Sequence, residues 1–416
     1  MKLQRLVLRN FRNIEEVTFS PSSGLNVLIG ANGQGKTSLI ESIGYLGLLR
    51  SFRGAHSDEV MRWNSQGAEI RAWVSPTGEL GDPWTTELRI HFEASSSLSG
   101  RRITKTAWIN GKSHRSSTSY LSQRFGEVEL GFHAVVFNPA DHDLVRGEPS
   151  IRRAYLDRVL GAQDLEYLKT LQKYQKSLEQ RNALLKEEGP LSEPLWRSFS
   201  EPLVSLGAWL AWKRLGWIQA AQPKATEHQS EIAPSQPKLG ICYVSNWVPK
   251  IANLSLSSRD LDSLHFAGQE GVPSLEKLEQ SFWNQMVLLR EAERRAGSTL
   301  VGPHRDDWTF LIGNQVLRGH GSQGEVRSAL LALKLSEIQL FQEATGHQPI
   351  LLLDDFSSEL DRDRRTTLLN ALTREDLQVF VTSTEDSVGT GLRFQVHEGK
   401  LQSDVTAKEA LEGMIR

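Results

Sequence analysis

Short apolar runs separated by turn residues open the chain. Residues 3–11 (LQRLVLRNF) and 25–30 (LNVLIG) are rich in leucine and valine, and the turn-forming SPSSG lies between them. Both runs are therefore predicted to be β-strands. From Lys36 onward the apolar residues fall three or four positions apart, which predicts a helix. These residues are Leu39, Ile40, Ile43 and Leu46.

The strand pattern recurs over residues 71–94 and 105–115. In the second segment the sequence WINGK places Asn110-Gly111 between two strand-like runs. An Asn-Gly pair suits a two-residue hairpin turn, because both residues tolerate a positive φ. A β-hairpin is therefore predicted at this point.

Helical spacing replaces the strand pattern after Pro149. Residues 151–185 repeat near heptad spacing for fewer than three heptads, which favours the seam of a helix bundle over a coiled coil. A second helical stretch runs from Trp196 to Trp217, with Pro202 expected early in a helix or between two. Residues 222–272 are rich in Ser, Pro and Gln and are predicted to be mostly loops. A third helix is predicted over residues 274–295.

Strand and helix patterns return beyond Thr299, which predicts one α/β domain formed by both ends of the chain. The expected division is residues 1–148 and 298–416 for this domain and residues 149–297 for an inserted, mostly helical lobe. A length of 416 residues fits two or three such lobes.

Composition excludes a few classes of protein. The net charge is −2, so any nucleic-acid site must be a local basic patch rather than a global excess of charge. A single cysteine, Cys242, rules out a disulfide framework within the chain and fits a reducing compartment. Neither a signal peptide nor a transmembrane run is apparent. The expected location is therefore the cytoplasm, without membrane contact.

A glycine-rich loop joins the strand at residues 25–30 to the helix that begins at Lys36. It matches the phosphate-loop pattern G-x-x-x-x-G-K-[ST] in full, and its place between strand and helix is the one this pattern requires. The backbone N–H groups and the helix start favour phosphate oxygens. Lys36 is expected to reach the β- and γ-phosphates and to assist catalysis, and Thr37 to hold Mg²⁺. The loop residues are Gly30, Ala31, Asn32, Gly33, Gln34, Gly35, Lys36 and Thr37.

Two distant segments are expected to complete a nucleotide site. The apolar strand at residues 350–353 ends in Asp354-Asp355, where Asp354 is predicted to bind Mg²⁺ and Asp355 to orient or deprotonate the attacking water. Upstream, Ser322-Gln323-Gly324 precedes a long helical pattern and is a candidate helix cap and phosphate ligand.

This order of motifs resembles the heads of ATP-binding-cassette ATPases. In that class Ser322-Gln323-Gly324 is similar to the signature motif, and residues 358–361 (SELD) to the D-loop. The resemblance implies that the signature helix of one head completes the phosphate loop of another, with ATP between two subunits.

Four longer stretches resemble the RecF family of bacterial recombination and repair proteins. They are LRNFRN with the phosphate loop, NPADHDLVRGEPSIRRAYLDRVL, VGPHRDDWTF, and LLLDDFSSELDRDRRTTL. The resemblance implies an ATP-driven homodimer that binds single-stranded, gapped and duplex DNA. It also implies a weak, DNA-stimulated ATPase that maintains replication forks, helps to load recombinase with RecO and RecR, and supports the SOS response.

The chain departs from these patterns in places. Ala140 stands where the RecF family usually has an acid. Cassette heads usually have Glu at the position of Asp355 and His where this chain has the run Thr382-Ser383-Thr384, although RecF proteins share these two features. They suggest slow hydrolysis and leave open a non-catalytic, ATP-gated clamp. Long-armed chromosome-maintenance relatives are disfavoured because the insertion is too short. Transporter heads lack both the NFRN start and the insertion.

Ten basic residues are candidates for contact with the DNA backbone. For Arg152 and Arg153, a structural salt bridge to Asp157 is an equal alternative. The candidates are Arg50, Arg53, Arg101, Arg102, Lys105, Lys112, Arg115, Arg146, Arg152 and Arg153.

Overall fold

The computed structural model describes residues 1–78, 82–97, 100–114, 116–125, 132–189, 191–248, 264–265, 271–313, 315–355, 377–384 and 391–403. The chain forms two compact units. One comprises residues 1–140 and 341–416, and the other residues 141–340. Residues 298–340, which the sequence analysis grouped with the ATPase domain, thus cluster with the helical segment. The assignment of head and inserted lobe by function stays a prediction.

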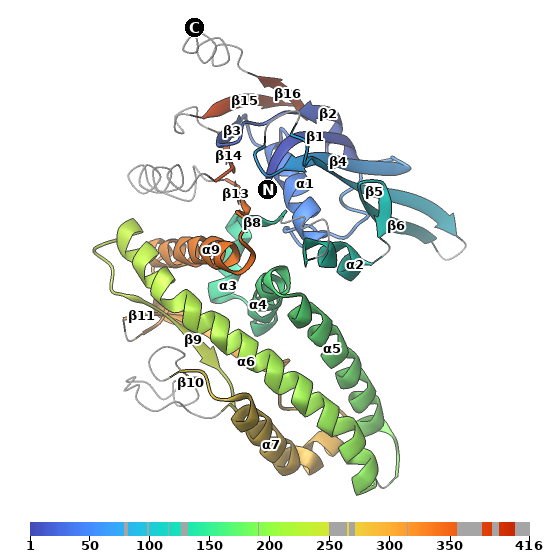
Figure 1. Ribbon diagram of the computed structural model, residues 1–416, viewed down its shortest axis with the longest axis vertical. Helices are drawn as coiled ribbons and strands as arrows, with labels where there is room; N and C mark the ends of the chain where they lie inside the picture. Colours follow the sequence, from blue (N-terminus) through green and yellow to red (C-terminus); the bar gives the residue numbers. More distant parts are fainter. Residues whose placement is uncertain are drawn as a thin grey trace. The chain divides into compact units, whose positions relative to one another are not determined.

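The first unit contains a six-stranded antiparallel sheet in the order β2-β1-β4-β5-β6-β7 (Figure 1). The predicted hairpin is confirmed between β6 and β7, where Asn110 and Gly111 have φ of 46° and 79°. Along β4 alternate residues are buried, which is why its apolar residues appear at every second position. The strands are β1 (Lys2–Phe11), β2 (Ile14–Phe19), β4 (Gly67–Ser75), β5 (Thr86–Ser97), β6 (Gly100–Ile109) and β7 (Lys112–His114).

A second six-stranded sheet in the same unit has the order β16-β15-β3-β14-β13-β8. All neighbouring pairs are parallel except β15 with β16. Four of the parallel strands are short and buried along almost their whole length, as expected for strands covered on both faces. They are β3 (Leu25–Ile29), β8 (Ala134–Phe137), β13 (Ile350–Leu353) and β14 (Val379–Ser383). Strand β15 (Leu392–His397) has exposed polar residues at Gln395 and His397, and β16 is Lys400–Ser403.

Helix α1 (Lys36–Leu48) packs against strands of both sheets. Its apolar residues are therefore buried around most of its circumference rather than along one stripe. One hydrophobic core joins the helix to the two sheets. A short helix α2 (Ser117–Leu121) also belongs to this unit. This arrangement fixes the start of α1, and with it the phosphate loop, against the ends of the parallel strands.

The second unit is mostly helical. The helical pattern predicted over residues 151–185 is two helices, because the Asp164 side chain accepts hydrogen bonds from the Glu166 and Tyr167 N–H groups and begins a new helix. Helices α5, α6 and α7 lie side by side, as the predicted bundle requires (Figure 1). The helices are α3 (Asp143–Arg146), α4 (Pro149–Gln163), α5 (Leu165–Lys186), α6 (Glu193–Ile232), α7 (Leu275–Ala296), α8 (Leu317–His320) and α9 (Gln323–Thr345).

Helix α6 corrects two sequence predictions. It is one continuous helix of 40 residues with Pro202 and Pro223 inside it, so Pro202 does not lie near its start or between two helices. It also extends through residues 222–232, which were predicted as loop. Buried residues continue along it to Ile232, and the Gln222 side chain bonds to the backbone of strand β9. Tertiary packing thus outweighs the cost of proline within the helix.

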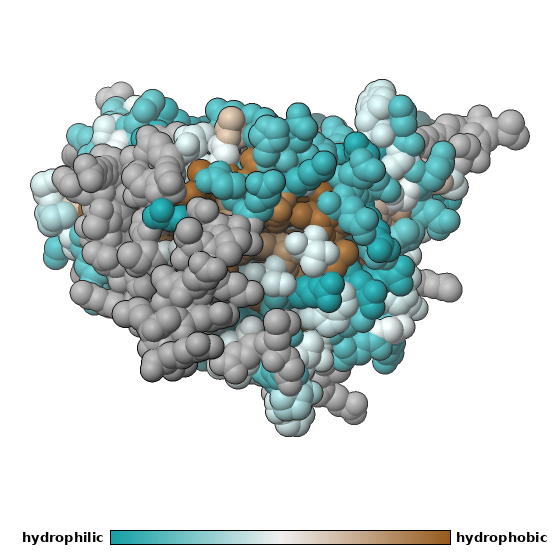
Figure 2. All heavy atoms as spheres, turned by 90° about the horizontal axis from the view of Figure 1, so that it is seen from above, coloured by the Kyte–Doolittle hydropathy of each residue, from teal (hydrophilic) through white to brown (hydrophobic). Residues whose placement is uncertain are grey.

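Strands β9 (Leu239–Val244), β10 (Leu264–His265), β11 (Asp307–Ile312) and β12 (Gln315–Val316) form a small antiparallel sheet in the order β10-β9-β11-β12. Across the described ranges, no helix is both long and apolar enough to cross a membrane. On the face drawn in Figure 2, the coloured residues are mostly hydrophilic, with a hydrophobic patch near the centre.

Candidate functional site

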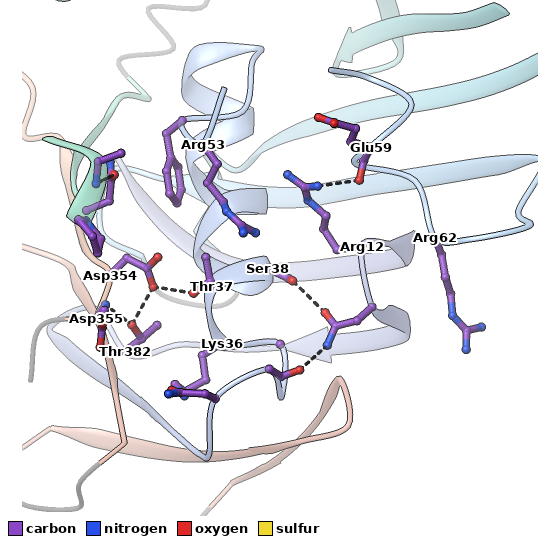
Figure 3. A pocket seen from close by; sticks show the side chains of 18 of the residues that line it. Arg12, Lys36, Thr37, Ser38, Arg53, Glu59, Arg62, Asp354, Asp355 and Thr382 are labelled. Carbon is purple, nitrogen blue, oxygen red and sulfur yellow. Dashed lines mark hydrogen bonds between the residues drawn. The ribbon is translucent and has the colours of Figure 1, made fainter. Parts of the chain in front are cut away.

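The predicted site residues of the first unit meet at one edge of the parallel sheet. Strands β3, β14, β13 and β8 are neighbours, and their carboxyl ends share this edge, where open α/β sheets bind ligands. A cavity of about 1110 Å³ opens there (Figure 3). The structure thus brings together, in its wall, Asn32, Gly33, Gly35, Lys36, Thr37, Asp354 and Asp355.

The backbone of the phosphate loop depends on its glycines. Gly33 and Gly35 have φ of 79° and 110°, a region that residues with a Cβ rarely adopt. At Gly30 a Cβ would lie 2.4 Å from the carbonyl oxygen of Val396 on β15. Gln34 anchors the loop, since its carbonyl oxygen accepts from the Gly399 N–H at 2.8 Å. The loop is therefore shaped locally and held by the β15–β16 turn.

Lys36 lies within the curve of this loop. Its Nζ donates to the carbonyl oxygens of Gly30 at 2.6 Å and Ala31 at 2.8 Å. Burial lowers the pKa of its ammonium below the usual value, and the charges of Asp354 and Asp355 oppose that shift. The side chain thus places a positive charge at the loop, where the charges of Asp354 and Asp355 act on it.

Three hydrogen-bonded side chains from three different elements meet in the cavity wall (Figure 3). They are Thr37 of α1, Asp354 directly after β13, and Thr382 of β14. Both threonine hydroxyls donate to Asp354 Oδ1, each at 2.9 Å. The Thr382 hydroxyl also accepts from the Asp355 N–H at 2.7 Å. Burial raises the pKa of Asp354, while the two hydroxyl hydrogen bonds lower it. Thr382 therefore connects the Asp354 carboxylate to the Asp355 backbone.

Asp355 has a strained backbone. Its φ is 52°, in the left-handed region that costs a residue other than glycine about 1 kcal/mol or more. This conformation turns the chain directly after β13 and leaves Asp355 in the cavity wall beside Asp354. A strained acidic residue in a cavity is a common feature of functional sites.

The oxygen atoms at this edge suit a hard divalent cation. Thr37 Oγ1 and Asp354 Oδ1 lie 2.9 Å apart, and Mg²⁺ is usually bound in phosphate sites by one or two protein oxygens together with phosphate and water. In the part of the chain that the structure describes, no group of three His, Cys, Asp or Glu side chains could hold a metal alone. A cation here would therefore depend on phosphate oxygens, as in nucleotide complexes.

Sequence reasoning missed the opposite wall of the cavity. Arg12 lies there and makes two bonds to the buried Glu41 of α1, from Nε at 2.9 Å and Nη2 at 2.6 Å. Its Nη1 donates to the Glu59 carbonyl oxygen (Figure 3). Arg53 also lies near Glu41, at 3.6 Å. The NFRN stretch was noted only as a family resemblance. Nothing local in the sequence indicates that Arg12 pairs with Glu41, a buried acid 29 positions later.

Asn138 and Ala140 also line the cavity. Asn138 follows β8 directly, and its Oδ1 accepts from the Ala140 N–H at 2.8 Å. Strand β8 is the parallel neighbour of β13, so the carboxyl ends of both strands lie at the same edge of the sheet. Ligands bind at that edge, and Asn138 therefore reaches the site just as Asp354 does. This inference needed the strand order, which the sequence did not reveal.

Ser322, Gln323 and Gly324 lie in the second unit, at the start of α9. The predicted capping role of Ser322 is confirmed. The Glu325 N–H donates to Ser322 Oγ at 3.2 Å, and the Ser322 N–H donates to Glu325 Oε2 at 2.8 Å, which is a capping box. Ser322 and Gln323 are exposed. The D-loop residues 358–361 lie outside the described residues.

Several proposed DNA contacts have structural partners instead. Arg152 is buried and makes two bonds to Asp307, at 2.6 and 2.7 Å. The alternative considered for Arg152, a salt bridge to Asp157, is wrong in its partner, because Arg152 pairs with Asp307 while Asp157 pairs with Arg214 at 2.7 Å. Lys105 donates to the Leu49 carbonyl oxygen at 2.6 Å.

The remaining basic candidates differ in exposure. Arg153 and Arg146 donate to the carbonyl oxygens of Asp306 and Gly321. The exposed candidates are Arg50, Arg53, Arg102, Lys112 and Arg146. Arg115 and the side chain of Arg101 lie outside the described residues.

Comparison with known proteins gives consistent matches over almost the whole chain. Residues 2–393 match the family model described as RecF/RecN/SMC N terminal domain. A curated relative from Geotalea uraniireducens, named DNA replication and repair protein RecF, is 33% identical over 96% of this chain and 100% of its own. A relative of the same name from Halalkalibacterium halodurans is 36% identical over 92% of this chain and 93% of its own.

Solved structures that resemble this chain include members of the same family. The recombination mediator protein RecF of the RecFOR pathway, in a form with ATP, is 30% identical with a TM-score of 0.79, covering 96% of this chain and 98% of that one. The form described as RecF-ATPrS has a TM-score of 0.77 at the same identity, over 97% and 98%. An Smc head domain from Pyrococcus furiosus has a TM-score of 0.52 at 16% identity, covering all of both chains, and supports the fold alone.

Proposed function

Since this chain belongs to the RecF family of DNA replication and repair proteins, we propose that its cavity binds ATP and that bound ATP drives a homodimer which holds DNA. The observation that carries the proposal is the convergence of Lys36, Thr37, Asp354 and Asp355 in one cavity. The related structures that contain ATP support the choice of nucleotide.

Each group of residues in the cavity is assigned a separate role. The loop N–H groups and the start of α1 bind the phosphates, and Lys36 adds a charge-assisted contact to the β- and γ-phosphates. Thr37 and Asp354 would hold Mg²⁺, which would supply positive charge against the phosphate oxygens. Asp355 orients the attacking water or accepts its proton.

Hydrolysis is proposed to be weak and stimulated by DNA. Asp355 has a shorter side chain than the Glu usual in cassette ATPases, and the threonine at position 382 is already bonded to Asp354 and to the Asp355 N–H. Both features suit a slow switch. A clamp that binds ATP without turnover differs from this only in rate, and turnover measured with and without DNA separates the two.

The dimer is proposed to place the α9 start of one subunit against the nucleotide of the other. Ser322 is exposed at a helix N-terminus, where its hydroxyl and N–H both donate to Glu325 Oε2 at 2.8 Å, so a phosphate would take the place of that carboxylate. DNA in single-stranded, gapped or duplex form would then lie against the paired subunits. The exposed candidates for its backbone are Arg50, Arg53, Arg102, Lys112 and Arg146. RecR, acting with RecO, is the proposed protein partner.

Lys36→Ala tests the proposal. Loss of the ammonium removes a contact worth about 1.5–3 kcal/mol, so ATP affinity should fall roughly 10- to 100-fold or more. Titration calorimetry with ATP and Mg²⁺ measures this directly. Lys176→Ala, at an exposed lysine of helix α5 outside the cavity wall, is the matched control and should bind ATP as the wild type does. Equal ATP affinity in the Lys36 variant and the wild type would contradict the assignment.

A further inference from the structure

Trp63 is an exposed aromatic residue in the wall of the nucleotide cavity. Its side chain is 89% exposed, although tryptophan gains more than most residues from burial. It lines the cavity that holds the phosphate loop, and it also lines a second hollow of about 590 Å³. The two hollows share Glu59, Met61, Arg62 and Trp63. The ring therefore stands between two open spaces, beside the phosphate loop.

The backbone that carries Trp63 is held firmly. Met61 is 5% exposed and forms a β-bridge with Phe11. The Arg62 N–H donates to the Asn10 carbonyl oxygen at 2.7 Å, and the Arg12 N–H to the Val60 carbonyl oxygen at 2.8 Å. The position of Trp63 is thus set by the end of β1, although its side chain has little contact of its own.

The same end of β1 is joined to the phosphate loop. Asn13 Nδ2 donates to the Gly33 carbonyl oxygen at 3.2 Å, and the Ser38 hydroxyl donates to Asn13 Oδ1 at 2.8 Å (Figure 3). A continuous set of backbone and side-chain bonds therefore connects the loop to residues 60–63. These bonds therefore fix the position of the Trp63 backbone relative to the phosphate loop.

The arginines near Trp63 are paired with acidic side chains, so the Trp63 ring is open to a ligand. Arg62 pairs with Glu15 at 2.9 Å, and Arg12 with Glu41, so both cations already have acidic partners. Arg62 and Arg12 are therefore engaged with acidic side chains, whereas the Trp63 ring is an aromatic surface left exposed in the same wall. That environment suits a flat, weakly polar heterocycle better than another phosphate.

We propose that Trp63 stacks against the purine base of the nucleotide whose phosphates Lys36 and the loop hold. This rests on the proposed function and adds the base-binding group, which the phosphate motif does not supply. Stacking on an aromatic ring is worth about 1–3 kcal/mol per base, because every base presents a π-face. Trp63 thereby raises affinity for the nucleoside part while leaving the phosphate contacts unchanged.

The test compares ATP with inorganic tripolyphosphate, which has the phosphates but no base. Binding of each ligand with Mg²⁺ is measured by calorimetry for wild type, Trp63→Ala, Trp63→Phe and Trp84→Ala. Trp84 is the matched control, since it is 75% exposed and does not line the cavity. Because both tryptophans are exposed, the variants are expected to fold.

The expected result is a weakening of ATP binding by about 5- to 100-fold in Trp63→Ala, with partial recovery in Trp63→Phe and no change in Trp84→Ala. Tripolyphosphate affinity should be the same in all four proteins. Equal ATP affinity in Trp63→Ala and wild type overturns the inference, as does an equal loss for both ligands. A Trp63→Ala protein that binds ATP normally but loses DNA also overturns it, and assigns the ring to DNA. If wild type binds neither ligand, the proposed function itself fails.

Discussion

Thr382 shows at the scale of single residues what sequence reasoning can and cannot reach. Asp354 and Asp355 were predicted from an acidic pair after an apolar strand, and the cavity contains both. The hydroxyl that connects them comes from a strand that begins 24 positions later, and only the pairing of β13 with β14 brings it there. Local patterns locate single ligands, whereas the contacts that orient them depend on tertiary structure.

Asp355→Asn separates binding from chemistry. Asn adopts the left-handed conformation of this position at least as readily as Asp, so the fold should be unchanged. ATP and dimer should persist while the hydrolysis rate falls about 100-fold or more, because a group that serves the water is lost. Phosphate release under single-turnover conditions measures it. Asp354→Asn is the contrast, and should instead weaken Mg²⁺-dependent ATP binding. Wild-type turnover in Asp355→Asn would remove the role proposed for this residue.

His304 is expected to make stability depend on pH. Burial lowers its pKa to about 4, and its ring bonds to the Tyr174 hydroxyl at 2.6 Å and the Thr299 carbonyl oxygen at 3.2 Å. An unfolded chain takes up this proton near pH 6.5, but the folded chain does so only near its lowered pKa. The free energy of unfolding should therefore fall by about 3 kcal/mol at most as pH drops from about 6.5 to about 4.

The matched variant for that effect is His304→Gln, which keeps a donor and an acceptor but does not titrate. Urea denaturation at several pH values should show a smaller loss of stability in acid for this variant than for wild type. Identical pH dependence in both proteins would show that His304 does not contribute.

At the scale of elements, helices and strands with a strong local pattern were predicted correctly. Features that depend on contacts between residues distant in sequence were not. Strand β3, helix α1, the hairpin at Asn110-Gly111 and helix α7 follow from local pattern and turn chemistry. Helix α6 does not, because its prolines argue for interruption while its buried side reaches Ile232. The order of the parallel strands, which places Asn138 in the site, has no local signal either.

The capping box of α9 gives a test at this scale. Glu325→Ala removes the carboxylate that accepts from the Ser322 N–H, and should lower the free energy of unfolding by about 1 kcal/mol. Glu325→Gln keeps a hydrogen-bonding side chain and should lose less. Chemical denaturation of the two variants measures the difference. Equal stability of Glu325→Ala and wild type would show that the box does not stabilise the helix.

The central proposal for the whole molecule is that two chains share each nucleotide. A single chain supplies both the phosphate-binding residues and Ser322, in its first and second units respectively. Ser322→Arg should therefore leave ATP binding by the monomer nearly unchanged, since Lys36 and Thr37 are untouched. It should nevertheless prevent the dimer, because a bulky side chain would meet the γ-phosphate of the partner.

Mixing two inactive variants tests the exchange between chains. In a dimer of one Lys36→Ala chain with one Ser322→Arg chain, one composite site lacks both groups and the other is complete. A mixed dimer could thus recover about half of the wild-type activity. The ATPase rate of the mixture against that of each variant alone gives the answer. A mixture as inactive as its components would oppose shared sites.

Sedimentation velocity of wild type and Ser322→Arg, with and without ATP, Mg²⁺ and gapped DNA, tests the central claim most directly. If two chains share each nucleotide, wild type should be a monomer that becomes a dimer with ATP and then sediments with DNA. The Ser322→Arg protein should bind ATP but remain a monomer and not sediment with DNA. A wild type that stays monomeric while saturated with ATP, or a Ser322→Arg monomer that cannot bind ATP at all, would contradict the shared site.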